Sequence, residues 1–303
     1  MRQTVSPYKQ YSEYLAELFS GKVQKVTLSL GNSCPNRDGT IGRGGCSYCN
    51  NASFSPAIGN IRQSVSAQIE AGKQFFRKKY PDMRFLAYFQ SYTNTHGNDL
   101  GVLTEAYREA MRSPGVVGII IGTRPDCVSD ELLAALKDLE LSEGKKVMME
   151  YGAESTFNET LERVNRCHTW ECTVDTVART RKFGLETGLH FIMGLPGETK
   201  EMMLQTVDRL NRLDIQSVKF HQLQIIKGTV LAGEYLESPE KFSLFTVEEY
   251  LDLCCEIVRR VRPEIAIERF TSSAPSELLL APKWGLKNYE FVHKLHAILR
   301  ERQ

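Results

Sequence analysis

The feature that most constrains the fold is a regular alternation between short apolar segments and longer stretches with helical spacing. Strands are predicted at 23–30, 84–90, 116–122, 146–152, 188–193, 216–225 and 264–268. Helices are predicted at 8–19, 61–79, 99–112, 129–140 with Ser129 as the N-cap, 171–187, 199–213 and 246–262. This alternation is typical of βα units around a parallel sheet, in which ligands gather at the carboxyl ends of the strands. Periodicity leaves open whether the sheet is flat or closed into a barrel.

Composition is that of an ordinary globular protein. The 303 residues are 42% hydrophobic and 25% charged, which argues against disorder, and the net charge of +1 gives no strong indication about partners. The sequence contains no signal-peptide core and no apolar run of membrane-spanning length, so we expect a cytoplasmic protein with no membrane association. The basic residues between 283 and 302 fit a solvated helix face or a phosphate-facing patch.

A glycine-rich loop with three cysteines follows the first predicted strand. In GNSCPNRDGTIGRGGCSYCNNASF, Cys34 is separated by eleven residues from Cys46, and Cys49 follows after two more. The glycines allow the backbone to bring three thiolates to one place. Of the eight cysteines, the adjacent Cys254 and Cys255 are expected on a helix, with their side chains in the protein core.

Three thiolates are an informative number of ligands. A 4Fe-4S cluster that only transfers electrons is held by four cysteines, whereas three leave one iron open, and the amino and carboxylate groups of S-adenosylmethionine (SAM) suit that position. The alternative is a zinc site completed by His96 or by a distant cysteine. Zinc ribbons usually pair two C-x-x-C knuckles, and this loop contains one.

These cysteines, with the aromatic Tyr48 just before the last of them, resemble the radical SAM superfamily. The likeness continues through the segments GTRPDCV, EYGAES, NRCHT, GLPGET and the KGT at 227–229. The CPNRDG opening, the GTRPD segment and the long spacing between the first two cysteines resemble the bacterial branch related to the Elongator catalytic subunit. In the superfamily's commonest pattern only three residues separate those cysteines.

The resemblance implies a fold and a domain organisation. The expected fold class is α/β, a partial (β/α)6 TIM-type barrel with a short N-terminal helix and a C-terminal extension, open on one side to admit a large substrate. Residues 1–230 would form the core barrel and 231–303 an extension that packs on the core and contacts substrate. The implied cofactors are a 4Fe-4S cluster, held by Cys34, Cys46 and Cys49, and SAM.

The resemblance also implies SAM contacts at the carboxyl ends of the strands. Tyr48 would lie near the adenine and Arg166 would pair with the methionine carboxylate. Residues 90–93 occupy the place of the family's glycine-rich motif but contain none of its glycines. The residues implied to contact SAM are Tyr48, Gln90, Ser91, Tyr92, Thr93, Glu154, Ser155, Arg166, His190, Ile192 and Gly194.

Each of these residues also has a structural interpretation. Glu154 can stabilise the dipole of a helix beginning near Thr156, and a lone strand histidine such as His190 is often a hydrogen-bonded core residue. Arg166 can be a surface residue, and GLPGE can be no more than a turn. The order of the motifs along the chain favours the functional interpretation.

The Elongator kinship implies tRNA as the substrate. We expect a radical SAM enzyme that acts on the 5-substituent of the wobble uridine, converting carboxymethylaminomethyl to aminomethyl, with a flavodoxin- or ferredoxin-type protein as the electron donor. The candidate substrate contacts are Lys219, His221, Lys227 and Arg269. Two alternatives stay open: a radical SAM enzyme for a small molecule or peptide, and a zinc-stabilised RNA-binding module.

Overall fold

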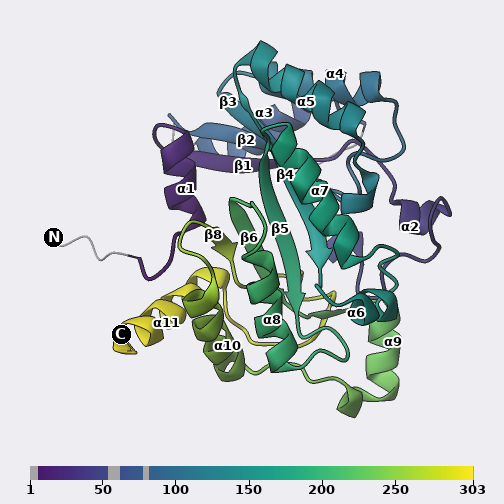
Figure 1. Ribbon diagram of the computed structural model, residues 1–303, viewed down its shortest axis with the longest axis vertical. Helices are drawn as coiled ribbons and strands as arrows, with labels where there is room; N and C mark the ends of the chain where they lie inside the picture. Colours follow the sequence, from purple (N-terminus) through teal and green to yellow (C-terminus); the bar gives the residue numbers. More distant parts are fainter. Residues whose placement is uncertain (1–5, 54–61, 78–81, 303) are drawn as a thin grey trace.

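A curled, fully parallel sheet forms the centre of the computed structural model, which describes residues 6–53, 62–77 and 82–302 (Figure 1). Within this part of the chain, seven strands pair in the order β1-β2-β3-β4-β5-β6-β8. They are β1 (Val23–Leu28), β2 (Arg84–Phe89), β3 (Val116–Thr123), β4 (Lys146–Glu154), β5 (Glu186–Met193), β6 (Ser217–Gln222) and β8 (Ala266–Arg269). Because all neighbouring pairs are parallel, all carboxyl ends meet at one edge.

Helices cover the outer face of the sheet and leave its inner face open as a half-barrel (Figure 1). The main core lies between sheet and helices, where β2 contributes Phe85, Ala87 and Phe89. The covering helices are α3 (Val65–Arg77), α4 (Leu100–Arg112), α5 (Asp130–Glu143), α7 (Trp170–Lys182), α8 (Lys200–Leu210), α10 (Val247–Arg260) and α11 (Asn288–Glu301). Cys254 and Cys255 are fully buried in this core, as expected.

The inner face is filled at one end by the N-terminal helix α1 (Tyr11–Leu18). Tyr11, Tyr14 and Leu15 of this helix form a second apolar cluster with inward-facing strand residues such as Tyr88 and Met148. Side chains alternate between the two faces of a strand, so residues two positions further along these strands also point into the half-barrel. Helix α1 therefore fills the half-barrel near the amino ends of the strands. Polar residues nearer the carboxyl ends of the strands line the part that remains open.

The predicted fold class is confirmed, with one addition to its six βα units: the last strand of the sheet, β8, comes from the C-terminal extension. Ser129 caps α5 as predicted, since its side chain accepts a hydrogen bond from the Leu132 amide. The helix predicted at 61–79 is observed as α3, while positions 61, 78 and 79 lie outside the described residues.

Several predicted boundaries are wrong. The helix predicted from 8 begins at Tyr11, the helix predicted from 61 begins at Val65, and the helix predicted to end at 140 ends at Glu143. The strand predicted at 216–225 ends at Gln222, because the chain leaves the sheet and Ile225–Ile226 (β7) pairs antiparallel with Leu279–Ala281 (β9). The helix predicted to reach 187 ends at Lys182, before the left-handed Gly184, and β5 begins at Glu186. The helix predicted to reach 213 ends at Leu210.

Short elements complete the chain, most of them in the loops at the carboxyl edge. They are α2 (Pro35–Asp38), η1 (Asn51–Ser53), η2 (Pro125–Cys127), α6 (Asn158–Arg163), α9 (Val230–Glu237) and η3 (Pro239–Lys241).

No helix in the described residues is both long and apolar enough to cross a bilayer.

Candidate functional site

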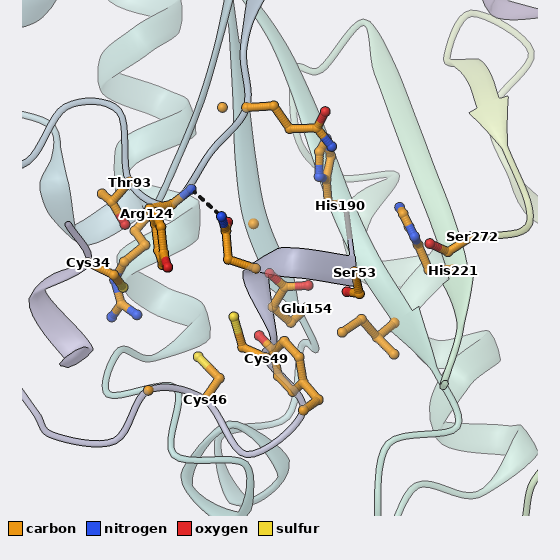
Figure 2. A pocket seen from close by; sticks show the side chains of 18 of the residues that line it. Cys34, Cys46, Cys49, Ser53, Thr93, Arg124, Glu154, His190, His221 and Ser272 are labelled. Atoms are coloured by element: carbon orange, nitrogen blue, oxygen red, sulfur yellow. Dashed lines mark hydrogen bonds between the residues drawn. The ribbon is translucent and has the colours of Figure 1, made fainter. Parts of the chain in front are cut away.

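An elongated cavity lies at the carboxyl ends of the strands, inside the half-barrel (Figure 2). The side chains of Cys34, Cys46 and Cys49 lie at one end, which we call the cysteine end (Figure 2). The opposite end, which we call the far wall, is formed by residues at and after the ends of β6 and β8: His221, Gln222, Gln224, Arg269 and Ser272.

The cysteine loop is shaped by hydrogen bonds within itself. Pro35 begins α2 directly after Cys34, and Arg37 of this helix donates to the Cys49 carbonyl at 2.7 Å. The Cys49 amide donates to the Cys46 carbonyl at 2.9 Å, which closes the C-x-x-C turn. A side chain at Gly42 would place its Cβ 2.2 Å from the Asn36 Oδ1 atom, so this close approach requires glycine.

A second loop, after α6, holds the cysteine loop from the other side. The Ser47 amide donates to the Val164 carbonyl at 2.9 Å, and the Asn165 side chain donates to the Gly45 carbonyl at 2.8 Å. Arg166 donates from Nη1 to the Cys46 sulfur at 3.5 Å and from Nη2 to the Gly152 carbonyl at 2.6 Å. The NRCHT segment thus connects Cys46 to the end of β4.

The GTRPD segment supports that second loop. Arg124 is 2% exposed and forms two hydrogen bonds with the Asp126 carboxylate, at 2.9 and 2.7 Å. Its Nη2 also donates to the Arg166 carbonyl at 2.8 Å. Because the fork of a guanidinium fixes several acceptors in one plane, Arg124 positions the backbone of Arg166.

Backbone strain is concentrated around this cavity. Among the described residues, the non-glycine positions with positive φ are Tyr92, Glu154, Asn165 and Cys167, at 56°, 66°, 54° and 62°. Tyr92 and Glu154 line the cavity, and the other two flank Arg166. Non-glycine residues adopt this conformation at a cost and do so most often at functional sites.

The cysteine end fits a cluster with an anionic ligand. Three thiols face one cavity, and two arginines that line it have a buried nitrogen without a hydrogen-bond partner, Arg166 Nε and Arg124 Nη1. In the described part of the chain, no three His, Cys, Asp or Glu side chains converge on a single ion position. In a 4Fe-4S cluster each thiolate binds a different iron, so the sulfurs surround a larger volume than around one ion.

Most of the predicted SAM contacts line this cavity. Glu154 lies at the end of β4, with Oε1 3.5 Å from Arg166 Nη2, and burial raises the pKa of its carboxyl although Arg166 opposes this. It precedes α6 by several residues and does not cap that helix. The lining residues are Tyr48, Gln90, Tyr92, Thr93, Glu154, Arg166, His190 and Ile192. Ser91, Ser155 and Gly194 lie outside the lining.

Of the predicted substrate contacts, His221 and Arg269 line the cavity. Lys219 lies beneath it, where Nζ is 2.6 Å from Glu150 Oε2. Lys227 is exposed and outside the lining, with its carbonyl accepting a hydrogen bond from Asn50 at 2.8 Å.

Four charged side chains form the floor of the half-barrel beneath the far wall. Lys25 lies 2.9 Å from Glu150 and 2.6 Å from Glu268, and Lys219 lies 2.6 and 3.2 Å from the same two carboxylates. Burial lowers the pKa of Lys219 to about 8, although the carboxylates raise it. For Glu150, attraction to Lys219 and Lys25 outweighs burial and holds the carboxyl pKa well below its usual value.

Both histidines near this floor are neutral at physiological pH. Burial lowers the pKa of His190 to about 4, with the charge of Lys219 adding to the effect, and its Nε2 contacts Glu150 Oε2 at 3.1 Å. Burial and the nearby Arg269 hold the pKa of His221 well below its usual value. His190 is therefore hydrogen-bonded, as its structural interpretation expects, and it also lines the cavity, while its contact with SAM stays a prediction.

Sequence reasoning missed several residues that line the cavity or form its floor. Arg37 and Arg124 belong to the CPNRDG and GTRPD segments, so those segments already contained the signal for them. Glu150 is an acid within a strand of otherwise apolar character, a pattern that predicts a paired buried charge. The far-wall residues Gln222, Gln224 and Ser272 gave no sequence signal.

Comparison with known proteins agrees with this geometry. The chain matches the Radical SAM superfamily over residues 28–210 and the Radical SAM C-terminal domain over 215–301. It is 34% identical over 299 residues to YtqA of Bacillus subtilis, covering 99% of this chain and 91% of that protein. A tRNA uridine(34) acetyltransferase of Methanocaldococcus jannaschii is 28% identical over 127 residues, 39% of this chain and 23% of the relative.

Among solved structures, the Elp3 protein of Methanocaldococcus infernus superimposes with a TM-score of 0.67 at 17% identity. The match covers 93% of this chain and 63% of the Elp3 chain, so this protein spans less than two thirds of that longer structure. At this identity the likeness concerns the fold. With the sequence match and the three-cysteine cavity, it places the chain in the Radical SAM superfamily, enzymes that bind a 4Fe-4S cluster and S-adenosylmethionine.

Proposed function

We propose that this protein acts on the wobble uridine of tRNA and converts its 5-carboxymethylaminomethyl group to an aminomethyl group. Two comparisons support a tRNA substrate: the Elp3-like fold and the partial similarity to a tRNA uridine(34) acetyltransferase. The observation that carries the proposal is the elongated cavity, in which a cysteine end faces a separate far wall of polar side chains. A modified base can occupy the far wall while the cofactors occupy the cysteine end.

In this proposal Cys34, Cys46 and Cys49 hold the cluster, and Arg166 and Glu154 hold the methionine part of SAM. When bound, the two cofactors would supply the 5'-deoxyadenosyl radical, which removes a hydrogen atom from the carboxymethyl carbon next to the nitrogen. With SAM as the net two-electron oxidant, that carbon becomes part of an imine, and once the radical is consumed water hydrolyses the imine to glyoxylate and the aminomethyl group. The protein orients the substrate carbon and excludes water from the cavity. A flavodoxin- or ferredoxin-type protein would supply the electron.

The base reaches the cavity only when it leaves the stacked anticodon loop. Enzymes that modify a base commonly bind it in such an extruded position. The far wall offers amide side chains at Gln222 and Gln224, and the Nε2 atoms of both donate to the Ser272 carbonyl, at 3.2 and 3.1 Å. These bonds hold a polar surface suited to the edge of a pyrimidine.

The test is anaerobic incubation of the reconstituted holoenzyme with SAM and dithionite. We expect 5'-deoxyadenosine to form and its formation to increase when tRNA from a strain lacking this protein is added. Nucleoside analysis of that tRNA should show carboxymethylaminomethyl uridine falling as aminomethyl uridine rises. An unchanged wobble uridine pool in the deletion strain, with 5'-deoxyadenosine formation that tRNA does not stimulate, would favour a small-molecule or peptide substrate.

A further inference from the structure

Arg269, at the end of β8, forms no ion pair with any side chain in the part of the chain that the structure describes. Its side chain lines the cavity, its Nε atom is buried without a hydrogen-bond acceptor, and Nη2 contacts His221 Nε2 at 3.3 Å. Among the described residues, no carboxylate forms an ion pair with Arg269. Because His221 is neutral, it accepts a hydrogen bond from the guanidinium but leaves its charge uncompensated.

The charges beneath Arg269 compensate one another. Lys25 and Lys219 lie between Glu150 and Glu268, and each lysine contacts both carboxylates within 3.2 Å. Two cations and two anions leave no net charge, so Glu268, the neighbour of Arg269 in sequence, is already paired. Counted over residues 6–53, 62–77 and 82–302, the far wall and its floor therefore have one positive charge in excess.

The uncompensated positive charge of Arg269 indicates that the ligand of the far wall carries a negative charge. A partly desolvated guanidinium without a counter-ion is unfavourable, and its planar donors match the two oxygens of a carboxylate. The arginines of the cysteine end, Arg124 and Arg166, lie at the opposite end of the cavity, where the carboxylate of SAM is expected. An anion at Arg269 must therefore come from the substrate.

We propose that Arg269, with His221 as its hydrogen-bonded support, binds the carboxylate of the carboxymethylaminomethyl group and selects substrates that carry it. This inference rests on the proposed function, because that group is the substrate's own carboxylate. A backbone phosphate of the RNA is the other anion available, and the test distinguishes the two. Arg269 is thus the specificity-determining residue of the far wall.

The test measures binding of anticodon stem-loop RNAs to the SAM-bound holoenzyme without reductant. One RNA carries carboxymethylaminomethyl uridine at the wobble position, and the second carries its neutral carboxamide. We expect the wild-type protein to bind the carboxylate RNA about 10- to 100-fold more tightly, the usual range for a hydrogen-bonded charge. Arg269→Gln should abolish this preference and leave the affinity for the carboxamide RNA within about twofold.

Two comparisons isolate the role of the charge. Arg269→Lys should recover part of the preference, because a lysine supplies charge but not two parallel donors. Arg260→Gln, which removes an exposed arginine paired with Asp208, should leave both affinities unchanged. If Arg269→Gln weakens both RNAs equally, Arg269 binds a phosphate or supports the structure, and the proposal is wrong.

A small-molecule arm separates failure of this inference from failure of the proposed function. 4-Phenylbutanoate has a ring, a three-atom linker and a carboxylate like those of the modified base, and 4-phenylbutanamide is its neutral counterpart. We expect the acid, and not the amide, to raise the melting temperature of the wild-type holoenzyme, and neither to raise that of Arg269→Gln. If no RNA binds but the acid discriminates, the tRNA assignment fails and the carboxylate site stands. If wild type and variant respond alike, the site is absent.

Discussion

The two ends of the cavity are built in different ways. At the cysteine end, one loop supplies all three thiols, and short hydrogen bonds from the segment after α6 hold it in shape. The far wall and its floor take residues from strands spread over the chain, from Lys25 in β1 to Arg269 in β8. The first is a local motif, whereas the second exists only because the sheet closes far enough to bring these strands together.

This difference separates the general chemistry from the choice of substrate. The cysteine end contains the features that match the superfamily, while the far wall contains the charges and amides that a particular substrate would meet. Changes at the two ends should therefore have separable effects. The cysteine end should control cofactor content, and the far wall should control stability and substrate preference.

The largest expected effect is at the cysteine end. Replacing Cys34, Cys46 or Cys49 by alanine should abolish bound iron and 5'-deoxyadenosine formation, because a cluster left with two thiolates is not retained. Iron and sulfide analysis of anaerobically purified protein measures this. Cys172→Ala, on α7 outside the cavity lining, should keep its iron. Full iron content in Cys46→Ala would contradict the assigned ligands.

The next effect is on stability at the floor of the far wall. Glu150→Gln leaves Lys25 and Lys219 without one of their two carboxylates, and breaking a buried pair of this kind costs about 3–5 kcal/mol. Urea unfolding should show the loss. Glu234→Gln, which removes a surface partner of Arg163, should cost at most about 1 kcal/mol. If both variants lose the same free energy of unfolding, the buried ion pairs of the floor contribute no more to stability than a surface ion pair.

A smaller effect is expected for Arg166→Lys. A lysine cannot contact the Cys46 sulfur and the Gly152 carbonyl together, so the loop after α6 loses its connection to β4. We expect SAM affinity, measured by equilibrium dialysis on the cluster-loaded protein, to fall about tenfold. Affinity for 4-phenylbutanoate should not change. If the affinities for SAM and for 4-phenylbutanoate both fall, the two ends of the cavity do not act independently.

The smallest effect is a pH dependence at the far wall. Lys219, with a pKa of about 8, loses its charge as pH rises from 7 to 9, so the positive potential near Arg269 falls. The affinity for 4-phenylbutanoate should then decrease roughly two- to fivefold, as expected for a charge interaction weakened by a high effective dielectric. The ionisable groups around Lys219 are Lys25, Tyr88, Glu150, His190, His221, Glu268 and Arg269. In Lys219→Met the affinity should not vary over this range, and a persisting decrease would assign it to another group.

The zinc alternative for the cysteine loop illustrates the limit of a local motif. Three cysteines at this spacing fit either metal centre, and His96 was available as a fourth ligand. In the structure His96 instead contacts Asp38 through Nε2 at 2.7 Å, and superfamily membership assigns the iron–sulfur cluster. The thiolate count alone did not decide between the two.

The sequence by itself determined the βα alternation, the cysteine loop and the family segments, because hydrophobic periodicity and short motifs are local properties. Only the tertiary structure decided that the chain leaves the sheet after Gln222, that Lys219 lies beneath the cavity, and that no carboxylate of the described residues pairs with Arg269. These properties depend on which side chains meet across strands distant in sequence. Burial and pairing of charges follow from that closure, and no local pattern encodes them.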